Sequence, residues 1–362
     1  MNTKSTASKI ESAFRKQAQN DKNVRNAYLL VNSDQLGIDL RIAEGKTGDQ
    51  PANILQPNHL ASVGKLFTAT LIGMLYEKNL LDYSDSIAKY LDSDLMNGLH
   101  VYKGTDYSGR ITIRHLLTQT SGLNDVFYEL YKKMISNPGF RSTPREAVIW
   151  GKENLQPVAP PGKKHFYADP NYYLAGLIVE KVCGKPFHEA MHEMVFEPIG
   201  MEHACMYGYS KPATENSQPP AALYIKDVNL FSVEGIHELD YAGGCVMAPL
   251  EDFLKFMKSL TGGKLIKKET LQLMIEDDYP MGFPVVGFDY GYSIWKLKSL
   301  PLIIPKKYFS WGCVGVTGAF MFFHPATRSY IIGSFNDFSY RGKALQFMMR
   351  KVIKELLKSL NS

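Results

Sequence analysis

Strand-like and helical patterns are distributed unevenly along these 362 residues, and this distribution constrains the fold more than any other feature. Residues 27–31 and 38–42 are typical of strands, and in the second of them apolar and charged side chains strictly alternate. Strand signals return only after about residue 240, at 287–295, 308–311, 318–323 and 330–336. Because a sheet can draw its strands from distant parts of a chain, we expect one sheet split in sequence between the two ends.

The region between these two groups of strands is mainly helical. Apolar residues recur at helical spacing in 66–80, 113–119, 143–154 and 171–183. Two further amphipathic stretches, 8–18 and 343–360, lie near the ends of the chain. The sequence therefore predicts an α+β or layered α/β fold in which a helical domain is inserted into the sheet domain.

Composition and charge exclude several classes of protein. Apolar residues make up 45% and charged residues 21% of the chain, which excludes a disordered, collagen-like or coiled-coil protein. The net charge of +5 is spread without dense Lys/Arg runs, so we expect no nucleic-acid partner. The longest apolar stretches fall far short of the roughly 20 residues that span a bilayer. The first twenty residues lack a signal-peptide core, and the four cysteines are scattered. We expect a cytoplasmic protein, with a processed secreted form as the alternative.

Ser62 and Lys65 form the strongest chemical signal, an SxxK pattern. Helix positions i and i+3 share a face, so the Lys amine can lie beside the Ser hydroxyl and take its proton. The pattern also occurs at Ser86–Lys89 and Ser293–Lys296. We expect Ser86 in a solvated helix cap, and Ser293 in a strand, where positions three apart point to opposite faces. Only Ser62 opens a long apolar helix that would bury the pair, so Ser62 is the predicted nucleophile.

A second pattern, Tyr-Ala-Asp-Pro-Asn, occupies residues 167–171. Asp169 followed by Pro170 is typical of a helix N-cap and first turn, so Asp169 has a structural explanation as well as a chemical one. Tyr167 lies just outside this cap, where its phenol can point into a cleft. Beside a Lys amine, such a phenol can be held as a phenolate and serve as a general base.

Glycines interrupt the strand-like stretch 311–320 at Gly312, Gly315 and Gly318. They weaken the strand locally and allow the backbone of a ligand to approach closely. A backbone N–H at this edge could complete an oxyanion hole with Ser62. A bulge or a sheet crossing explains the same glycines, and from this segment alone we favour that interpretation over the oxyanion hole.

Residues 188–192 match HExxH, the zinc-peptidase pattern. His188 and His192 fall on the polar border of a short amphipathic helix, and no third ligand follows at a typical distance; Glu202 and Glu234 are the remaining candidates. We favour a half-exposed helix face over a zinc site, and we expect no metal ion or other cofactor.

Several stretches together resemble the class C β-lactamase and penicillin-binding-protein-like serine hydrolases, a family that includes esterases and D-amino-acid peptidases. The matching stretches follow the family order between about residues 27 and 336, and are 59–69, 111–123, 167–180, 196–201, 242–244 and 312–320. The resemblance implies a β-lactamase/transpeptidase-like α/β (α+β) fold: an antiparallel β-sheet flanked by N- and C-terminal helices, with an inserted mainly helical domain. It implies a discontinuous sheet domain at 1–60 and 240–362, a helical domain at 61–239, and a site in the cleft between them.

The resemblance also implies roles for single residues. Ser62 matches the acylated nucleophile, and Lys65 matches its proton-handling partner. Tyr167 matches the tyrosine that acts as general base and then activates the deacylating water. The backbone N–H groups of Ser62 and Val316 match the oxyanion hole.

One departure from the family pattern concerns the proton-handling groups. Asp169 stands where the family has the Asn of its Tyr-x-Asn motif. An ionised Asp can only accept hydrogen bonds, so it tends to keep Lys65 charged. This substitution favours Tyr167 over Lys65 as the base.

A larger departure is Cys313-Val314-Gly315, which replaces the Lys-Thr-Gly or His-Thr-Gly of the family. The cation and hydroxyl that would hold a substrate carboxylate are both missing. Their loss should weaken binding of a carboxylate by on the order of 1.5–3 kcal/mol, unless Lys296 or Arg341 supplies a cation.

We therefore predict a serine hydrolase that forms an acyl-enzyme on Ser62 and acts as an esterase or amidase on small substrates without a free carboxylate. The predicted substrate-binding residues are Asp169, Cys313, Val314 and Gly315. A β-lactamase or D-Ala-D-Ala carboxypeptidase (penicillin-binding protein) is the first alternative, and a non-catalytic binding relative is the second. The expected partner is a small-molecule ester, amide or peptide, and the oligomeric state is left open.

Overall fold

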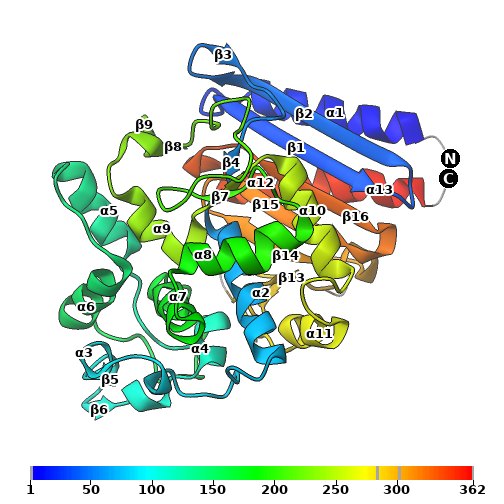
Figure 1. The fold of residues 1–362 in the computed structure, drawn as a ribbon. Helices are drawn as coiled ribbons and strands as arrows, with labels where there is room; N and C mark the ends of the chain where they lie inside the picture. The colour runs from blue at the N-terminus through cyan, green and yellow to red at the C-terminus, as the bar shows by residue number, and fades with distance from the viewer. Residues whose placement is uncertain (1–2, 283–284, 301–302, 361–362) are drawn as a thin grey trace.

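The computed structural model describes residues 3–282, 285–300 and 303–360. Within them, the main element is a nine-stranded antiparallel sheet of order β11-β12-β13-β14-β15-β16-β1-β2-β3. Its first strand in sequence, β1 (Asn26–Ser33), pairs on one side with β2 (Ile38–Thr47) and on the other with β16 (Ser329–Ser334). The two ends of the chain therefore meet in one sheet, as the sequence predicts (Figure 1).

The other strands of this sheet are β3 (Gln50–Pro51), β11 (Tyr279–Pro280), β12 (Phe288–Tyr290), β13 (Trp295–Leu297), β14 (Ser310–Gly315) and β15 (Ala319–His324). The prediction of a single strand at 287–295 is wrong in one respect. A tight turn divides this stretch into β12 and β13, because the Gly291 N–H donates to Ile294 O at 2.8 Å and Ser293 has a φ of +61°. Ser293 therefore lies in a turn rather than in a strand.

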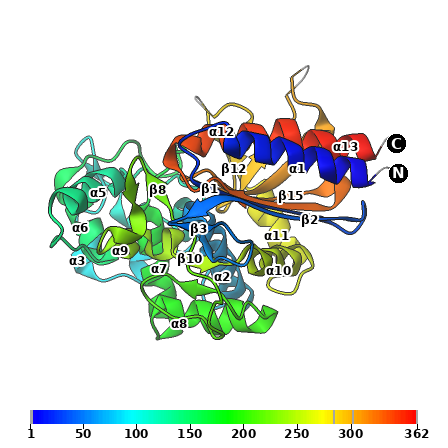
Figure 2. The ribbon, with the colours of Figure 1, turned by 90° about the horizontal axis from the view of Figure 1, so that it is seen from above.

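Helices from both ends of the chain cover one face of the sheet (Figure 2). They are α1 (Thr3–Gln19), α12 (Arg341–Phe347), a π-helical segment (Met348–Ile353) and α13 (Lys354–Ser359). Ile10 and Phe14 of α1 are fully buried, and the Phe14 ring packs against the rings of Phe335 and Phe347. The expected flanking of the sheet by N- and C-terminal helices is confirmed.

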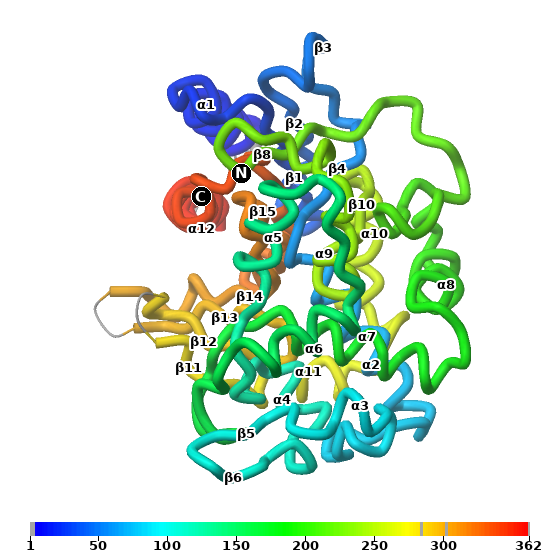
Figure 3. Tube along the Cα trace, turned by 90° about the vertical axis from the view of Figure 1, so that its left-hand side faces the viewer, coloured from blue at the N-terminus to red at the C-terminus, as the bar shows by residue number. Residues whose placement is uncertain are grey.

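The opposite face of the sheet carries α2 (Gly64–Glu77), α10 (Leu250–Thr261) and α11 (Lys268–Glu276) (Figure 3). Phe67 of α2 stacks on Phe256 of α10 with 3.7 Å between the ring centroids, so these two helices form one apolar layer under the sheet. This layer fixes the start of α2, where Ser62 lies, relative to the strands above it.

The remaining helices before residue 245 lie mostly to the left of α2 in Figure 1. They are α3 (Ser93–Met96), α4 (Ile113–Leu117), α5 (Phe127–Ser136), α6 (Pro144–Asn154), α7 (Pro170–Cys183), α8 (Phe187–Met191) and α9 (Ile236–Gly244). The helices expected near 66–80, 113–119, 143–154 and 171–183 are confirmed as α2, α4, α6 and α7. The domain boundaries near residues 60 and 240 stay a prediction.

A second, three-stranded sheet has the order β4-β10-β7 and consists of β4 (Asn58–His59), β7 (Cys205–Met206) and β10 (Val246–Ala248); β4 directly precedes the Ser62 turn. Two small hairpins, β5 (Val101–Tyr102) with β6 (Thr105–Asp106) and β8 (Tyr224–Ile225) with β9 (Val228–Asn229), lie apart from the main sheet. Across the described ranges, no helix has both the length and the apolar character needed to cross a membrane.

Candidate active site

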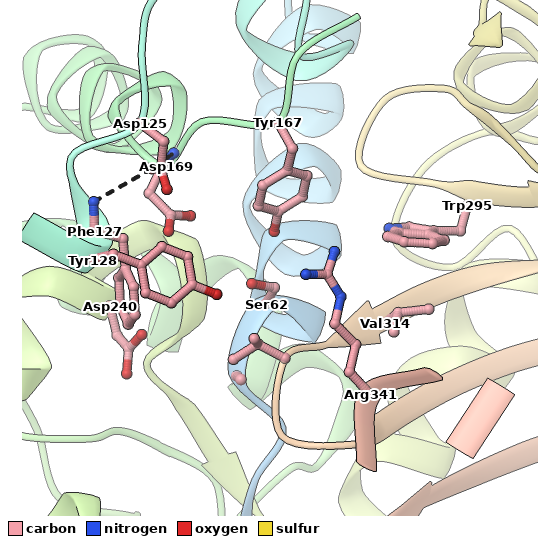
Figure 4. Close-up of a pocket in the computed structure, with 12 residues that line it drawn as sticks. Ser62, Asp125, Phe127, Tyr128, Tyr167, Asp169, Asp240, Trp295, Val314 and Arg341 are labelled. Carbon is pink, nitrogen blue, oxygen red and sulfur yellow. Dashed lines mark hydrogen bonds between the residues drawn. The ribbon is translucent and has the colours of Figure 1, made fainter. Parts of the chain in front are cut away.

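Ser62 lies in a single turn of 3-10 helix (Ala61–Val63) that continues directly into α2. The preceding Ala61 has a φ of +49°, a left-handed conformation that costs a non-glycine residue free energy and is common at functional sites. Gly64 lies so close to the backbone of Gly244 that a Cβ would come within 2.9 Å of it. These constraints present the Ser62 side chain to a cavity of about 170 Å³ (Figure 4).

Lys65 is buried beneath Ser62, one helical turn further along α2, with 1% of its surface exposed. Its Nζ donates to Ser62 Oγ at 3.2 Å and to Gly243 O at 3.1 Å, and lies 2.6 Å from Asp169 Oδ1. A Cβ on Gly243 would lie only 3.1 Å from Nζ, so the glycine makes room for the ammonium group. The helical spacing of the SxxK pattern thus brings the two side chains together, as expected.

The charge of Lys65 depends on its neighbours. Burial alone would lower the Lys65 pKa, but the Asp169 carboxylate and the Tyr167 phenol outweigh it, and the net pKa is raised. Lys65 is therefore an ammonium ion at neutral pH. This agrees with the expectation that Asp169 keeps Lys65 charged.

Asp169 occupies the N-cap position of α7, but its side chain makes no capping hydrogen bond. Its backbone is already helical, with φ −66° and ψ −30°, and its carboxylate turns to Lys65 instead. The capping explanation of Asp169 is therefore wrong, because a buried ammonium group attracts the carboxylate more strongly than the backbone N–H groups of the helix do. Pro170 follows at the first helical position, as expected.

Tyr167 lines the cavity opposite Ser62, and its ring centroid lies 5.1 Å from Lys65 Nζ. Its Oη is buried and has no hydrogen-bond partner among the described residues. Burial raises the Tyr167 pKa to about 12, although the nearby Lys65 charge opposes the rise. The neutral phenol is therefore the resting form, rather than the phenolate considered from the sequence.

Gln119 holds the backbone on both sides of Tyr167. Its backbone carbonyl accepts from the Phe166 N–H at 2.8 Å, and its side-chain Oε1 accepts from the Ala168 N–H at 2.9 Å. Gln119 itself has a φ of +58°, and its side chain is fully buried. Gln119 belongs to the family-like stretch 111–123, to which the sequence assigned no role, so the structure adds a positioning function for it.

The strand next to Ser62 is β14, which pairs with β13 on one side and β15 on the other. The Cys313 thiol donates to Ser62 O at 3.2 Å, and a Cβ on Gly315 would overlap Leu60 O. Gly312 likewise lies directly on the backbone of β15, at Met321. The glycines of this stretch therefore allow close approach of the protein's own backbone rather than forming a bulge. Burial raises the Cys313 pKa to about 12, so its thiol stays protonated.

Some of the predicted oxyanion and substrate-binding residues line the cavity, and the others are buried behind the residues that line it. Ser62, Val314 and Val316 line the cavity, and Asp169 lies on the opposite side of it. Cys313 and Gly315 are buried behind this wall. The structure thus brings Ser62, Lys65, Tyr167 and the end of β14 around one space.

Sequence reasoning missed several groups that line this cavity. They are Asp125, Phe127, Tyr128, Asp240 and Trp295 (Figure 4). Asp125 comes two residues after the family-like stretch 111–123, and Asp240 two residues before the stretch 242–244. Proximity to those stretches is the signal that could have pointed to the two carboxylates, whereas nothing local marks Trp295.

Of the two cations that could replace the missing Lys or His of the family motif, Arg341 lines the cavity. Lys296 instead forms an ion pair with Asp278 and is absent from the cavity wall. It is therefore unavailable for a substrate, because its charge is already balanced.

The competing motifs have structural roles. Ser86 caps a 3-10 turn (Ile87–Lys89) by accepting from the Ala88 N–H at 3.3 Å, which agrees with the expected solvated cap. Ser293 is buried in the turn between β12 and β13, where its hydroxyl bonds to Tyr172. In the HExxH segment, His192 Nε2 is bonded to Ser210 Oγ at 2.8 Å. Among the described residues, no group of three or more His, Cys, Asp or Glu side chains is arranged to hold a metal ion.

Comparison with known sequences gives two kinds of relative. The chain is 26% identical over 295 residues to the ML-236A carboxylate methylbutanoyltransferase mlcH of Penicillium citrinum, covering 74% of this chain and 69% of that protein. It is 27% identical over 250 residues to the putative penicillin-binding protein PbpX of Bacillus subtilis (strain 168), covering 66% of this chain. The match spans only 56% of the length of PbpX.

Solved structures with the same fold include hydrolases. The D-amino acid amidase of Ochrobactrum anthropi SV3, complexed with L-phenylalanine, superposes with a TM-score of 0.79 at 19% identity over 99% of this chain and all of that chain. EstCE1, a hydrolase with promiscuous acyltransferase activity, gives a TM-score of 0.78 at 17% identity, covering 98% of this chain and 99% of that one. The family model described as Beta-lactamase matches residues 42–348, most of the sequence. The chain therefore belongs to the β-lactamase and penicillin-binding-protein-like family.

Proposed function

We propose that the chain is a serine hydrolase that forms an acyl-enzyme on Ser62 and cleaves small esters or amides. The observation that carries this proposal is the contact of 3.2 Å between Lys65 Nζ and Ser62 Oγ at the cavity wall. A buried, unpartnered Tyr167 phenol faces the same space. A nucleophile, a fixed positive charge and a proton carrier together suit acyl transfer.

In the proposed acylation step, Ser62 Oγ attacks the substrate carbonyl while its proton moves to the Tyr167 oxygen in its deprotonated form. The raised pKa of Lys65 keeps a positive charge beside that oxygen. The tetrahedral intermediate then collapses, the bond to the leaving group breaks, and Tyr167 returns the proton to the leaving group.

In deacylation, a water oxygen is the nucleophile and Ser62 Oγ is the leaving group. Water attacks the acyl carbon, gives one proton to Tyr167, and Ser62 leaves with that proton. The backbone N–H groups of Ser62 and Val316 are the proposed donors to the carbonyl oxygen in both steps, since both residues line the cavity.

The proposed substrates lack a free carboxylate. Val314 presents an apolar side chain to the cavity where the family motif has a hydroxyl, and Cys313 is buried behind it. The names of the relatives, an acyltransferase, an amidase and a hydrolase, are compatible with ester or amide substrates.

A second candidate function, hydrolysis of β-lactams or D-Ala peptides, is favoured by Arg341. This guanidinium lines the cavity next to β14 and could bind the carboxylate that those substrates carry. Steady turnover of a chromogenic cephalosporin, lost in Arg341→Gln, would support this candidate over the first.

The test of the proposed function is intact-mass spectrometry after incubation with a fluorophosphonate. We expect one adduct on the wild type and none on Ser62→Ala, with Ser86→Ala as the matched control that keeps the adduct. No adduct on folded wild-type protein would overturn the proposal and favour a non-catalytic binding relative.

A further inference from the structure

The walls of the Ser62 cavity carry opposite charges (Figure 4). Three carboxylates, Asp125, Asp169 and Asp240, lie on one side of Ser62, and we call this side the acidic wall. Asp169 is neutralised by Lys65 at 2.6 Å. Asp125 and Asp240 have no ion-pair partner of fixed positive charge among the described residues.

Asp125 is held in place by backbone groups. Its Oδ1 accepts from the Asp169 N–H at 2.9 Å and from the Phe127 N–H at 3.4 Å. These two bonds orient the carboxylate without balancing its charge. Within the described ranges, no hydrogen bond is made to the second oxygen, Oδ2, which leaves it available to a ligand in the cavity.

Asp240 is held by a neutral ring. His59 Nδ1 accepts from the Ala61 N–H at 3.2 Å, so the His59 proton lies on Nε2, which is 3.4 Å from Asp240 Oδ2. Burial lowers the His59 pKa to about 4, so this ring carries no charge near neutral pH. The acidic wall thus keeps two carboxylates whose charge the protein does not compensate.

The opposite wall has donors that also lack partners. Arg341 forms no ion pair with any carboxylate in the described part of the chain, although three carboxylates line the same cavity. Trp295 is 2% exposed, and its Nε1 is buried without an acceptor among the described residues. A buried donor left unsatisfied is costly, so the Trp295 N–H points to a ligand that supplies an acceptor, and the exposed Arg341 can pair with the same ligand.

We propose that the acidic wall is a subsite for a protonated amine, so that the preferred substrates are aminoacyl esters or amides whose ammonium group contacts Asp125 and Asp240. This inference rests on the proposed function of Ser62. The carbonyl or leaving-group side of the same substrate then faces Trp295 and Arg341, whose N–H groups donate hydrogen bonds to oxygen acceptors. An ammonium group fits because it is compact and donates three hydrogen bonds to carboxylate oxygens.

The experiment compares two substrates that differ by a single ammonium group: alanine p-nitroanilide, in both enantiomers, and propionyl p-nitroanilide. The amine alters the intrinsic reactivity of the anilide, so the readout is how the ratio of kcat/KM values changes between wild type and variants. We expect Asp240→Asn to lower the ratio of the amine substrate to the neutral one by tenfold or more. Asp125→Asn is the second variant and should lower the same ratio.

Two controls separate charge recognition from damage to the site. Asp227→Asn removes a carboxylate that is 98% exposed and does not line the cavity, and it should leave the ratio unchanged. Arg341→Gln alters the opposite wall and should change both substrates by similar factors. An equal loss for both substrates in Asp240→Asn and Asp125→Asn would overturn the inference.

Fluorophosphonate labelling of each variant separates the two proposals. Labelling depends on Ser62 and requires no amine, so it reports a folded, reactive site. Labelled variants with an unchanged substrate ratio would refute the amine subsite and leave the serine hydrolase intact. Absence of labelling in the wild type would refute the proposed function itself.

Discussion

Two regions of this protein carry the same SxxK spacing with different surroundings. Lys65 and Lys89 each pair with an aspartate, at 2.6 Å from Asp169 and 2.9 Å from Asp85. The Lys65 side chain is 2% exposed, whereas the Lys89 side chain is 58% exposed. In the buried pair, Lys65 Nζ donates to Ser62 Oγ at 3.2 Å, whereas the exposed Lys89 Nζ donates to Asp85. The same spacing therefore gives a serine–lysine contact outside bulk water in only one of the two places.

The hydroxyl groups of the two serines are also used differently. Ser86 Oγ donates to Gly109 O at 2.9 Å and accepts from the Ala88 N–H, so it is occupied in holding a turn. Ser62 Oγ accepts from Lys65 and otherwise faces a cavity. We therefore expect reactivity to depend on the space that the tertiary structure leaves open beside the serine rather than on the spacing alone.

The largest expected effect separates the two serines directly. Ser62→Ala should reduce ester hydrolysis by at least about 10³-fold, because the oxygen atom that we propose is acylated is lost. Ser86→Ala should leave activity unchanged and lower the free energy of unfolding by about 0.5–2 kcal/mol, the usual contribution of a cap. Hydrolysis of p-nitrophenyl acetate and urea denaturation measure the two outcomes. Comparable activity losses in both variants would show that the SxxK spacing, and not its surroundings, determines which serine is reactive.

Removing the two lysines should give the next largest difference. Lys65→Met leaves the Asp169 carboxylate buried without its partner, which should cost about 3–5 kcal/mol of unfolding free energy. Lys89→Met removes an exposed pair and should cause no measurable change. Adding Asp169→Asn to Lys65→Met should recover much of the lost stability, since the unpaired charge is then absent. Urea denaturation of the two single variants and the double variant checks this; no recovery would mean that the cost is one of packing.

The pH dependence tests which group takes the proton from Ser62. With a Tyr167 pKa of about 12, the deprotonated fraction grows with pH throughout the accessible range. For a neutral ester, kcat/KM should therefore rise about tenfold per pH unit above pH 7 without a plateau. A plateau beginning near pH 7–8 would contradict Tyr167 as the base. Stopped-flow acylation between pH 6 and 10 makes the measurement, and Tyr167→Phe should remove the slope.

The smallest expected effect concerns the stability cost of the acidic wall. Burial, together with the neighbouring Asp169, raises the Asp240 pKa from its ordinary 3.8 to about 7. The folded state thus binds this proton more tightly than the unfolded state, so stability should fall as pH rises from about 4 to about 7. Asp240→Asn should be more stable than wild type by about 1–3 kcal/mol at pH 8, with little difference at pH 4. Thermal or urea unfolding of both proteins at pH 4 and pH 8 measures this difference. If the wild type were more stable than Asp240→Asn at pH 8, the charge of Asp240 would be balanced within the folded protein.

Local patterns predicted most of the fold. Alternation and helical spacing identify β1, β2, β15, β16 and the long helices, because these signals need only neighbouring residues. The prediction of a strand at 287–295 was wrong at Ser293, which has a left-handed turn conformation. Serine is not a residue type that marks such a turn in the sequence, as glycine or asparagine would. The capping prediction for Asp169 was wrong for another reason. Its neighbours in sequence are typical of a helix cap, but its carboxylate pairs with Lys65, which lies 104 residues earlier in the chain.

By itself, the sequence determined the split sheet, the order of the family-like stretches and the pairing of Ser62 with Lys65 on one helical turn. Each of these depends on short spacings that the backbone geometry enforces. Only the tertiary structure decided which cation remains available and which carboxylates surround Ser62, the proposed nucleophile. Asp240, Trp295 and Arg341 come from a helix, a strand and a second helix that are far apart in the chain. These side chains meet only because packing brings them to the wall of one cavity, where groups distant in sequence come close enough to interact.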